Sequence, residues 1–337
     1  MSAGAHSLGL APAPHLHGGG TVARLMLHSV IALLPVTVFA VASFGLAVLA
    51  VIVVAVAACL LAERVSAPRS ALNDGSAMLT GLLLGLSLPP ALPLWMVAVG
   101  GFVTMFVGKH LFGGLGGPVF HPVLVGRVFL QAAFPAAMAQ AWLSPFASGR
   151  ISELPATALA VPFLQPAAAF DGISGATPLT ALKAGEEAAP VLDLWLGTVA
   201  GSSGETSALL LLAGGLYLVW QRVIDWRIPT AILAVVAVLS ATLHGIDGER
   251  FASAPVALAS GGLMLGAWFL ATDSAVSPMT RKGAWLYGLF IGTLVVVIRE
   301  FSGQAEGVVY ALLLGSALTP HIDRWTRPRP LATGDST

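Results

Sequence analysis

The chain has 337 residues, of which 56% are hydrophobic and only 9% are charged. An average soluble domain has about 25% charged residues, and the mean hydropathy of this chain is +0.87. These values exclude a water-soluble enzyme and indicate a protein of the lipid bilayer. The 16 basic and 16 acidic side chains give zero formal net charge. The basic surface that nucleic-acid binding needs is therefore missing, and nucleic acid is excluded as a partner.

The chain has a single cysteine, Cys59, within an apolar run. One thiol excludes a disulfide framework, a thiolate zinc site and a cysteine-ligated iron–sulfur cluster within this chain. His28 and His244 are lone histidines on apolar segments, so we expect no metal site. A redox cofactor carried by this chain would have to be organic.

Five membrane spans are expected in the first half, since a span needs about 20 apolar residues. They are Val22 to Val41, Phe44 to Leu61, Gly75 to Leu88, Leu92 to Leu111 and Pro122 to about Trp142. A turn around Ser43 joins the first two. The third is short and ends at Pro89 and Pro90, because proline cannot continue a helix, and the chain then re-enters at once.

Five further spans are expected in the second half. They are Leu192 to Arg222, which is interrupted from Gly201 to Gly204, then Ile228 to Leu243, Ala254 to Thr272, Trp285 to Ile298 and Gly307 to Leu318. The eighth span weakly repeats the pattern of small and apolar residues in the third. A repeat with an odd number of spans must be inverted in the membrane. We therefore predict an all-α polytopic protein of about ten transmembrane helices, in two inverted five-helix repeats with broken helices.

The domain boundaries and the orientation follow from the polar segments. We expect an N-terminal tail over 1–21 that is not a cleaved signal, repeats over 22–143 and 191–320, a polar loop over 144–190, and a C-terminal tail over 321–337. Lys and Arg favour cytoplasmic loops, and one side would collect Arg24, Arg64, Arg69, Lys109, Arg222, Arg227, Arg281, Lys282, Arg324, Arg327 and Arg329. The other side would have Arg150, Lys183, Arg250 and Arg299. Both termini are thus predicted to be cytoplasmic and the 144–190 loop to lie outside.

The outer loop contains the sequence Asp171-Gly172-Ile173-Ser174-Gly175-Ala176-Thr177-Pro178. The Thr177 hydroxyl lies beside glycine and alanine, so a modifying enzyme could approach it. On these residues alone, an ordinary Asp-Gly turn with a proline stop is an equally simple interpretation.

This segment resembles the flavinylation motif, in which a flavin transferase attaches FMN through a phosphoester to the last threonine. By that resemblance Thr177 is the attachment residue, and Asp171, Ser174, Gly175 and Ala176 complete the motif. Other segments are similar to RnfD, a membrane subunit of the Rnf complex, over about residues 14 to 331. They are Gly75 to Ala77 leading to Pro89 and Pro90, Gly113 to Gly116, Pro122 with Gly126 and Arg127, Gly204 to Ser207, Ala271 to Asp273, and Ile322 to Arg324.

NqrB, a component of the sodium-pumping NADH:quinone reductase, represents a sister family with the same motif. The Thr177-Pro178-Leu179 continuation, the modest length and the arginine- and proline-rich C-terminus favour the Rnf member. Two positions depart from the pattern. His121 stands where asparagine is usual before Pro122, and Ser274 stands where proline is usual after Asp273.

The resemblance implies an electron-transfer subunit of an ion-translocating ferredoxin:NAD oxidoreductase in the bacterial inner membrane, inactive by itself. Its covalent FMN would lie on the periplasmic side and pass electrons between neighbouring subunits, which include a second flavin-bearing subunit and iron–sulfur subunits. A noncovalent riboflavin is also implied, but no segment identifies its site. The transported ion would be Na+ or H+.

Two acidic residues are candidates for ion binding or coupling, since a carboxylate inside a membrane marks a functional site by default. Glu205 lies in the interrupted sixth span, where Ser202 to Glu205 also fits a capping box that would open the second half-helix. Asp273 follows the eighth span and could instead end that helix or meet Arg281 and Lys282. No residue is assigned a catalytic role.

Lys109, His110 and the glycines that follow them have simpler interpretations. We expect Lys109 and His110 to extend from the end of the fourth span toward the cytoplasmic interface. Gly113 to Gly117 do not follow a strand, so they fail the context of a dinucleotide-binding loop. A backbone break that lines an internal cavity suits these glycines better.

Two other classes of function fit the same hydropathy pattern. Ten spans with broken helices and a repeat also describe a transporter or channel, which would move a solute without a flavin. A membrane scaffold with an unmodified motif is the third alternative. The Thr177 motif discriminates the redox subunit from both.

Overall fold

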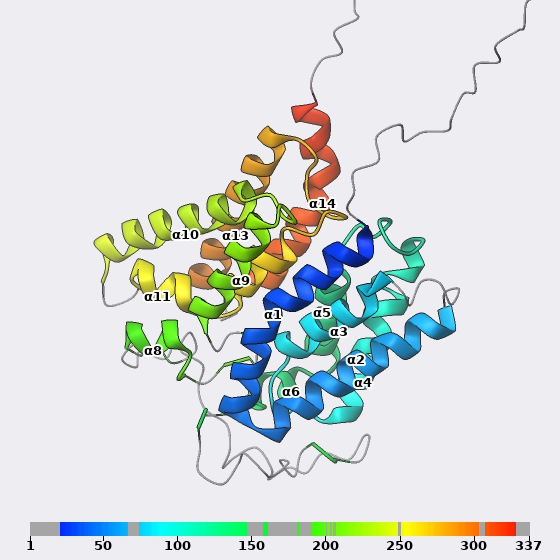
Figure 1. Ribbon diagram of the computed structural model, residues 1–337. Helices are drawn as coiled ribbons and strands as arrows, with labels where there is room; N and C mark the ends of the chain where they lie inside the picture. The colour runs from blue at the N-terminus through cyan, green and yellow to red at the C-terminus, as the bar shows by residue number, and fades with distance from the viewer. Residues whose placement is uncertain are drawn as a thin grey trace, which may run out of the picture.

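The computed structural model describes residues 21–66, 74–143, 145–146, 158–160, 181, 190–199, 201–202, 204, 207–248, 251–302 and 307–327. Within these ranges every regular element is a helix. The helices of the first half and those of the second half form two groups that pack side by side (Figure 1). The expected all-α architecture is therefore confirmed for the described residues.

The helices of the first half begin and end close to the predicted segments. They are α1 (Val22–Phe44), α2 (Leu46–Ser66), α3 (Ser76–Ser87), α4 (Leu94–Phe106), the short η2 (His110–Phe112), α5 (Pro122–Ala133) and α6 (Pro135–Gln140). The α1–α2 turn falls at Gly45, with φ +71°, rather than at Ser43, because a left-handed residue is easiest for glycine. Pro135 divides the expected fifth span into α5 and α6.

The second half contains more interruptions than the first. Its helices are α8 (Val191–Leu196), α9 (Ala208–Trp220), α10 (Arg227–Ile246), α11 (Ala254–Ala259), α12 (Leu263–Leu265), the π-helical segment η3 (Gly266–Leu270), α13 (Arg281–Phe301) and α14 (Val308–Thr326). The expected eighth span is broken, because Ser260 leaves the helical conformation and Gly261 has φ +62°. The sixth span is interrupted as expected, with Gly197 in the left-handed region.

Five segments of the described chain are long and apolar enough to cross a bilayer. They are α1, α2, α10, α13 and Leu94–Phe112, which joins α4 to η2. The apolar helices α3, α5 and α9 are shorter. These helices make the chain a polytopic membrane protein, whereas the count of ten spans and the inverted repeat stay predictions.

Close helix packing in both halves depends on glycine. On α3, an added Cβ at Gly81 would lie 2.6 Å from Val56 Cα, and one at Gly85 would lie 2.9 Å from Ile52 Cα, both on α2. Gly288 and Gly292 on α13 face α10 in the same way. Small residues let membrane helices approach closely, so their van der Waals contacts hold the bundle together.

The two halves meet at the interrupted helices. The Gly204 N–H donates a hydrogen bond of 2.6 Å to the Leu86 carbonyl near the end of α3. An added Cβ at Gly204 would approach Leu86 on one side and Leu265 of α12 on the other. This contact satisfies a peptide group that the end of α3 leaves free, as an apolar interior requires.

Candidate functional site

The residues predicted to carry the covalent flavin lie outside the described residues. This applies to Asp171, Ser174, Gly175, Ala176 and Thr177, and also to Glu205. The expected capping box from Ser202 to Glu205 is wrong, because α9 begins at Ala208. Its N-cap is Ser207, whose hydroxyl accepts from the Leu210 N–H at 3.3 Å. The segment before it is held instead by the Gly204 contact with Leu86.

A cavity of about 450 Å³ lies where the two halves meet. Its walls come from α1, α3, the chain between η2 and α5, the end of α9, and η3 with the loop that follows it. The polar lining residues include Ser76, Lys109, His121, Trp268 and Asp273. Leu115, Gly116 and Pro118 also line the cavity, which confirms the expectation that the glycine-rich break borders an internal cavity.

His121 and Asp273 face each other across this cavity. The structure places His121 Nε2 3.5 Å from Asp273 Oδ2, with 6% and 27% of the two side chains exposed. His121 is the N-cap of α5, and its Nδ1 accepts from the Val123 N–H at 3.3 Å. Asp273 therefore lies on the cavity wall beside the His121 departure, and contacts with Arg281 or Lys282 are not among its interactions in the described chain.

Trp268 is a buried hydrogen-bond donor on the same cavity. It lies in η3, is 3% exposed, and lines the cavity together with Phe269. Its Nε1 has no hydrogen-bond partner among the described residues. A π-helical turn is rare and often marks a functional site, and a buried indole N–H usually finds an acceptor. Trp268 is thus suited to donate a hydrogen bond to a molecule in the cavity.

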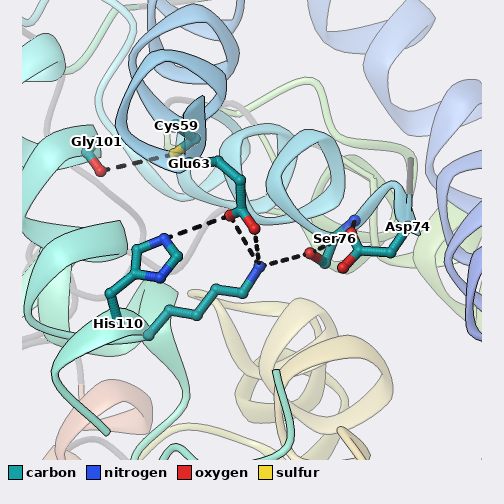
Figure 2. Close-up of polar contacts among 7 residues, drawn as sticks. Cys59, Glu63, Asp74, Ser76, Gly101 and His110 are labelled. Carbon is teal, nitrogen blue, oxygen red and sulfur yellow. Dashed lines mark hydrogen bonds and ion pairs between the residues drawn. The ribbon is translucent and has the colours of Figure 1, made fainter. Parts of the chain in front are cut away.

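A second polar cluster adjoins the cavity and centres on Glu63 of α2 (Figure 2). Lys109 Nζ lies 2.9 Å from both Glu63 carboxylate oxygens and donates a third hydrogen bond of 2.7 Å to Ser76 Oγ. The Ser76 hydroxyl donates in turn to Asp74 at 2.6 Å. Glu63 is 1% exposed and Lys109 3% exposed, so a complete ion pair lies in the interior.

The surroundings of the ion pair are largely apolar. His110 Nε2 lies 3.6 Å from Glu63 Oε2, and Cys59, one helical turn before Glu63, directs its thiol toward the Gly101 carbonyl at 3.8 Å (Figure 2). Cys59 is fully buried. The prediction that Lys109 extends to the cytoplasmic interface is therefore wrong, because the charge of Glu63 holds its ammonium inside.

Comparison with known proteins decides the family. The model of the NQR2, RnfD, RnfE family matches residues 10–332. The chain belongs to this family. It is 38% identical to the subunit designated D in the proton-translocating ferredoxin:NAD(+) oxidoreductase complex of Clostridium ljungdahlii, over 96% of each chain. Similar relatives are the correspondingly designated subunits of two ion-translocating oxidoreductase complexes, that of Stutzerimonas stutzeri, 41% identical over 92% of each chain, and that of Halorhodospira halophila, 37% identical over 95% and 94%.

Membership of the NQR2, RnfD, RnfE family identifies the chain as similar to translocase subunits, but several residues of its site lack a sequence signal. Glu63 lies at the end of an apolar run and is followed by Arg64, a pattern typical of a helix end at the membrane surface. Trp268 is one of eight tryptophans and differs from the others only in its position on the π-helical turn. The broken helix before Asp273 was the one usable signal for this region.

Proposed function

We propose that this chain is the membrane-embedded, covalently flavinylated RnfD component of an Rnf-type ferredoxin:NAD oxidoreductase, which couples electron transfer to Na+ or H+ transport. The observation that carries the proposal is the conjunction of two findings. The chain matches its relatives from ion-translocating oxidoreductase complexes over almost their full length, and its Asp171 to Thr177 segment has the order of the flavinylation motif. Neither a transporter nor a scaffold requires that motif.

In this proposal Thr177 holds FMN through a phosphoester on its hydroxyl, after a flavin transferase has acted. The flavin supplies one-electron chemistry when bound, and the protein sets its position and potential. Asp171, Ser174, Gly175 and Ala176 would form the segment that the transferase recognises. The neighbours in electron transfer would be a second flavin-bearing subunit and iron–sulfur subunits of the same complex.

The proposed topology places both termini in the cytoplasm of a bacterial inner membrane and the Thr177 loop in the periplasm. The start of α1 and the end of α14 both lie in the upper part of Figure 1, while α6 and α8, which flank the loop in sequence, lie lower. Exposed Trp220, Trp226 and Trp325 lie near basic residues at the upper side, as expected for an aromatic belt.

The packing order supports two related repeats. In the first half α2 packs on α4 and α4 on α5, and in the second half α10 packs on α13 and α13 on α14. Each half also has a short interrupted element in third place, α3 in one and α11 with α12 in the other. An inverted repeat with broken helices would place ion and cofactor sites at the contact between the halves.

We propose that the cavity takes the noncovalent flavin. Its volume of about 450 Å³ lies within the usual range for small-molecule pockets, roughly 300–1,000 Å³. Trp268 offers an N–H without a partner, Asp273 offers a carboxylate, and Phe269 offers an apolar ring face. These residues fit a planar heteroaromatic ring with both donors and acceptors on its edge. Asp273 would then act on this ligand, and Glu205 stays the proposed ion or coupling residue.

The covalent site is tested by in-gel flavin fluorescence after denaturing electrophoresis. The full chain is co-expressed with a flavin transferase as the wild type, as Thr177→Ala, and as Thr180→Ala, which changes a nearby threonine outside the motif. We expect a fluorescent band in the wild type and in Thr180→Ala, and none in Thr177→Ala. A dark wild type beside a labelled known substrate of the transferase would contradict the redox proposal and leave solute flux as the next measurement.

A further inference from the structure

His121 has a fixed arrangement of protons because both ring nitrogens have assigned neighbours. Nδ1 accepts from the Val123 N–H at 3.3 Å, so this nitrogen carries a lone pair and no proton. In the neutral imidazole the proton is then on Nε2, which faces Asp273 Oδ2 at 3.5 Å. Burial lowers the pKa of His121, which precedes α5, although Asp273 beside it acts in the opposite direction.

Asp273 is oriented on both of its carboxylate oxygens. Oδ1 accepts from the Ala275 N–H at 3.1 Å, and Oδ2 faces the Nε2–H of His121. Each oxygen has a further lone pair, and the carboxylate belongs to the cavity wall. Asp273 can therefore accept a hydrogen bond from a ligand without giving up either of its protein neighbours.

The cavity thus presents one donor and one acceptor to a ring of suitable size. The unpaired Trp268 N–H suits a carbonyl oxygen, while the Asp273 carboxylate suits an N–H group. The pyrimidine edge of a flavin has an imide N–H between two carbonyls and matches both. A quinone has only acceptors on its ring, so its carbonyl oxygen would meet the carboxylate unfavourably.

We propose that His121 is a positioning residue that holds Asp273 as the acceptor for an imide N–H, so that the pair selects a flavin ring over a quinone. This inference rests on the proposed function, which places a noncovalent flavin in the cavity. Neutral histidine offers a lone pair to α5 and an N–H to Asp273. Asparagine, which is usual at this position, has the same two groups on its side-chain amide, so the departure at His121 preserves the chemistry.

The test compares riboflavin with N3-methylriboflavin, which lacks the imide N–H but keeps the ring. The purified complex, freed of noncovalent flavin, is titrated with each compound, and binding is followed by quenching of flavin fluorescence. In the wild type we expect riboflavin to bind at least about tenfold more tightly than the methylated compound, the usual worth of a hydrogen bond to a charged group. In His121→Leu the ratio should fall below about threefold, and in His121→Asn it should return to about tenfold.

A purely structural role would weaken both compounds equally and leave the ratio unchanged, so an unchanged ratio in His121→Leu would overturn the inference. Asp273→Asn tests the same acceptor if His121→Leu does not accumulate, and its ratio should also fall. Binding of neither compound to the wild type would overturn the noncovalent flavin site and this inference with it. The covalent band at Thr177 is measured separately on a denaturing gel, so that failure is distinguishable from failure of the covalent site.

Discussion

Lys109 Nζ lies 2.9 Å from both carboxylate oxygens of Glu63, although 46 residues separate them in the chain. Both side chains are almost completely buried. Taking two charges out of water costs several kcal/mol per ion, which is offset only when the pair is close and its other hydrogen bonds are made. Ser76 supplies the third acceptor for Lys109, so the ammonium is fully satisfied and ties the start of α3 and the chain after α4 to α2.

Removing one charge of this pair should destabilise the protein strongly. Glu63→Gln leaves the buried ammonium of Lys109 without its counterion, a change that typically costs about 3–5 kcal/mol. Cys59 is the only cysteine of the chain and is fully buried one turn from Glu63. A thiol-reactive fluorophore therefore reports opening at this cluster, and the apparent unfolding temperature in detergent should fall by roughly 5–15 °C.

The matched control replaces both charges at once. Glu63→Gln combined with Lys109→Met removes the pair without leaving an isolated ion, so most of the lost stability should return. A double variant as unstable as Glu63→Gln alone would show that packing around these side chains, rather than their charge, determines stability here.

The positions of helices were predictable from the sequence to a degree that the contacts were not. Proline at 89 and 90 and glycine from 201 to 204 act locally on the backbone, so the ends of α3 and the interruption before α9 could be located. The approach of Lys109 to Glu63 depends on how α2, α3 and α4 pack in three dimensions. Long polar side chains at span ends usually reach the interface, and that general tendency misled the prediction.

The same contrast applies to the candidate site. The motif at Thr177 is local in sequence and could be recognised by its order of residues. The cavity is built from segments that lie far apart, with His121 before α5 and Asp273 after η3, and no spacing rule connects them. Arg299 was assigned to an outer loop, yet it is 3% exposed within α13, because its partners belong to a helix break that hydropathy reads as a continuous span.

The packing of α3 on α2 should be sensitive to a single methyl group. An added Cβ at Gly81 would meet the backbone of Val56 at 2.6 Å, and backbone cannot move aside as a flexible side chain can. Gly81→Ala should therefore lower stability by about 1–3 kcal/mol, measured by the same thermal unfolding of detergent-solubilised protein. Gly245→Ala in α10 is the control, since nothing lies within 4 Å of an added Cβ there. Equal effects of the two substitutions would argue against close α2–α3 packing.

Arg299 should be required for the break between α11 and α12. Its Nη1 donates to the Ala257 carbonyl and its Nη2 to the Ser260 carbonyl, both at 2.8 Å. A cation at the carboxyl end of a helix is favourable, and the planar guanidinium reaches two carbonyls that one ammonium cannot match. Arg299→Met should cost about 2–4 kcal/mol of stability and Arg299→Lys about half as much.

Arg281→Met is the appropriate comparison for Arg299, because Arg281 is exposed at the start of α13. It should change stability by less than about 0.5 kcal/mol. If Arg299→Lys proved as stable as the wild type, the charge alone would suffice and the two-carbonyl geometry would carry no weight.

Glu205 follows Gly204, whose N–H contacts the end of α3, and is our candidate for coupling electron transfer to ion movement. We expect Glu205→Gln, in the complete complex reconstituted in vesicles, to abolish ion uptake while ferredoxin:NAD electron transfer proceeds, since the neutral amide keeps the shape of the side chain but not its charge. Glu187→Gln, a change in the polar 144–190 loop, should leave both activities at the wild-type level. Ion transport that survives in Glu205→Gln would remove this carboxylate from the pathway and leave Asp273 as the acidic residue to examine at the contact between the two halves.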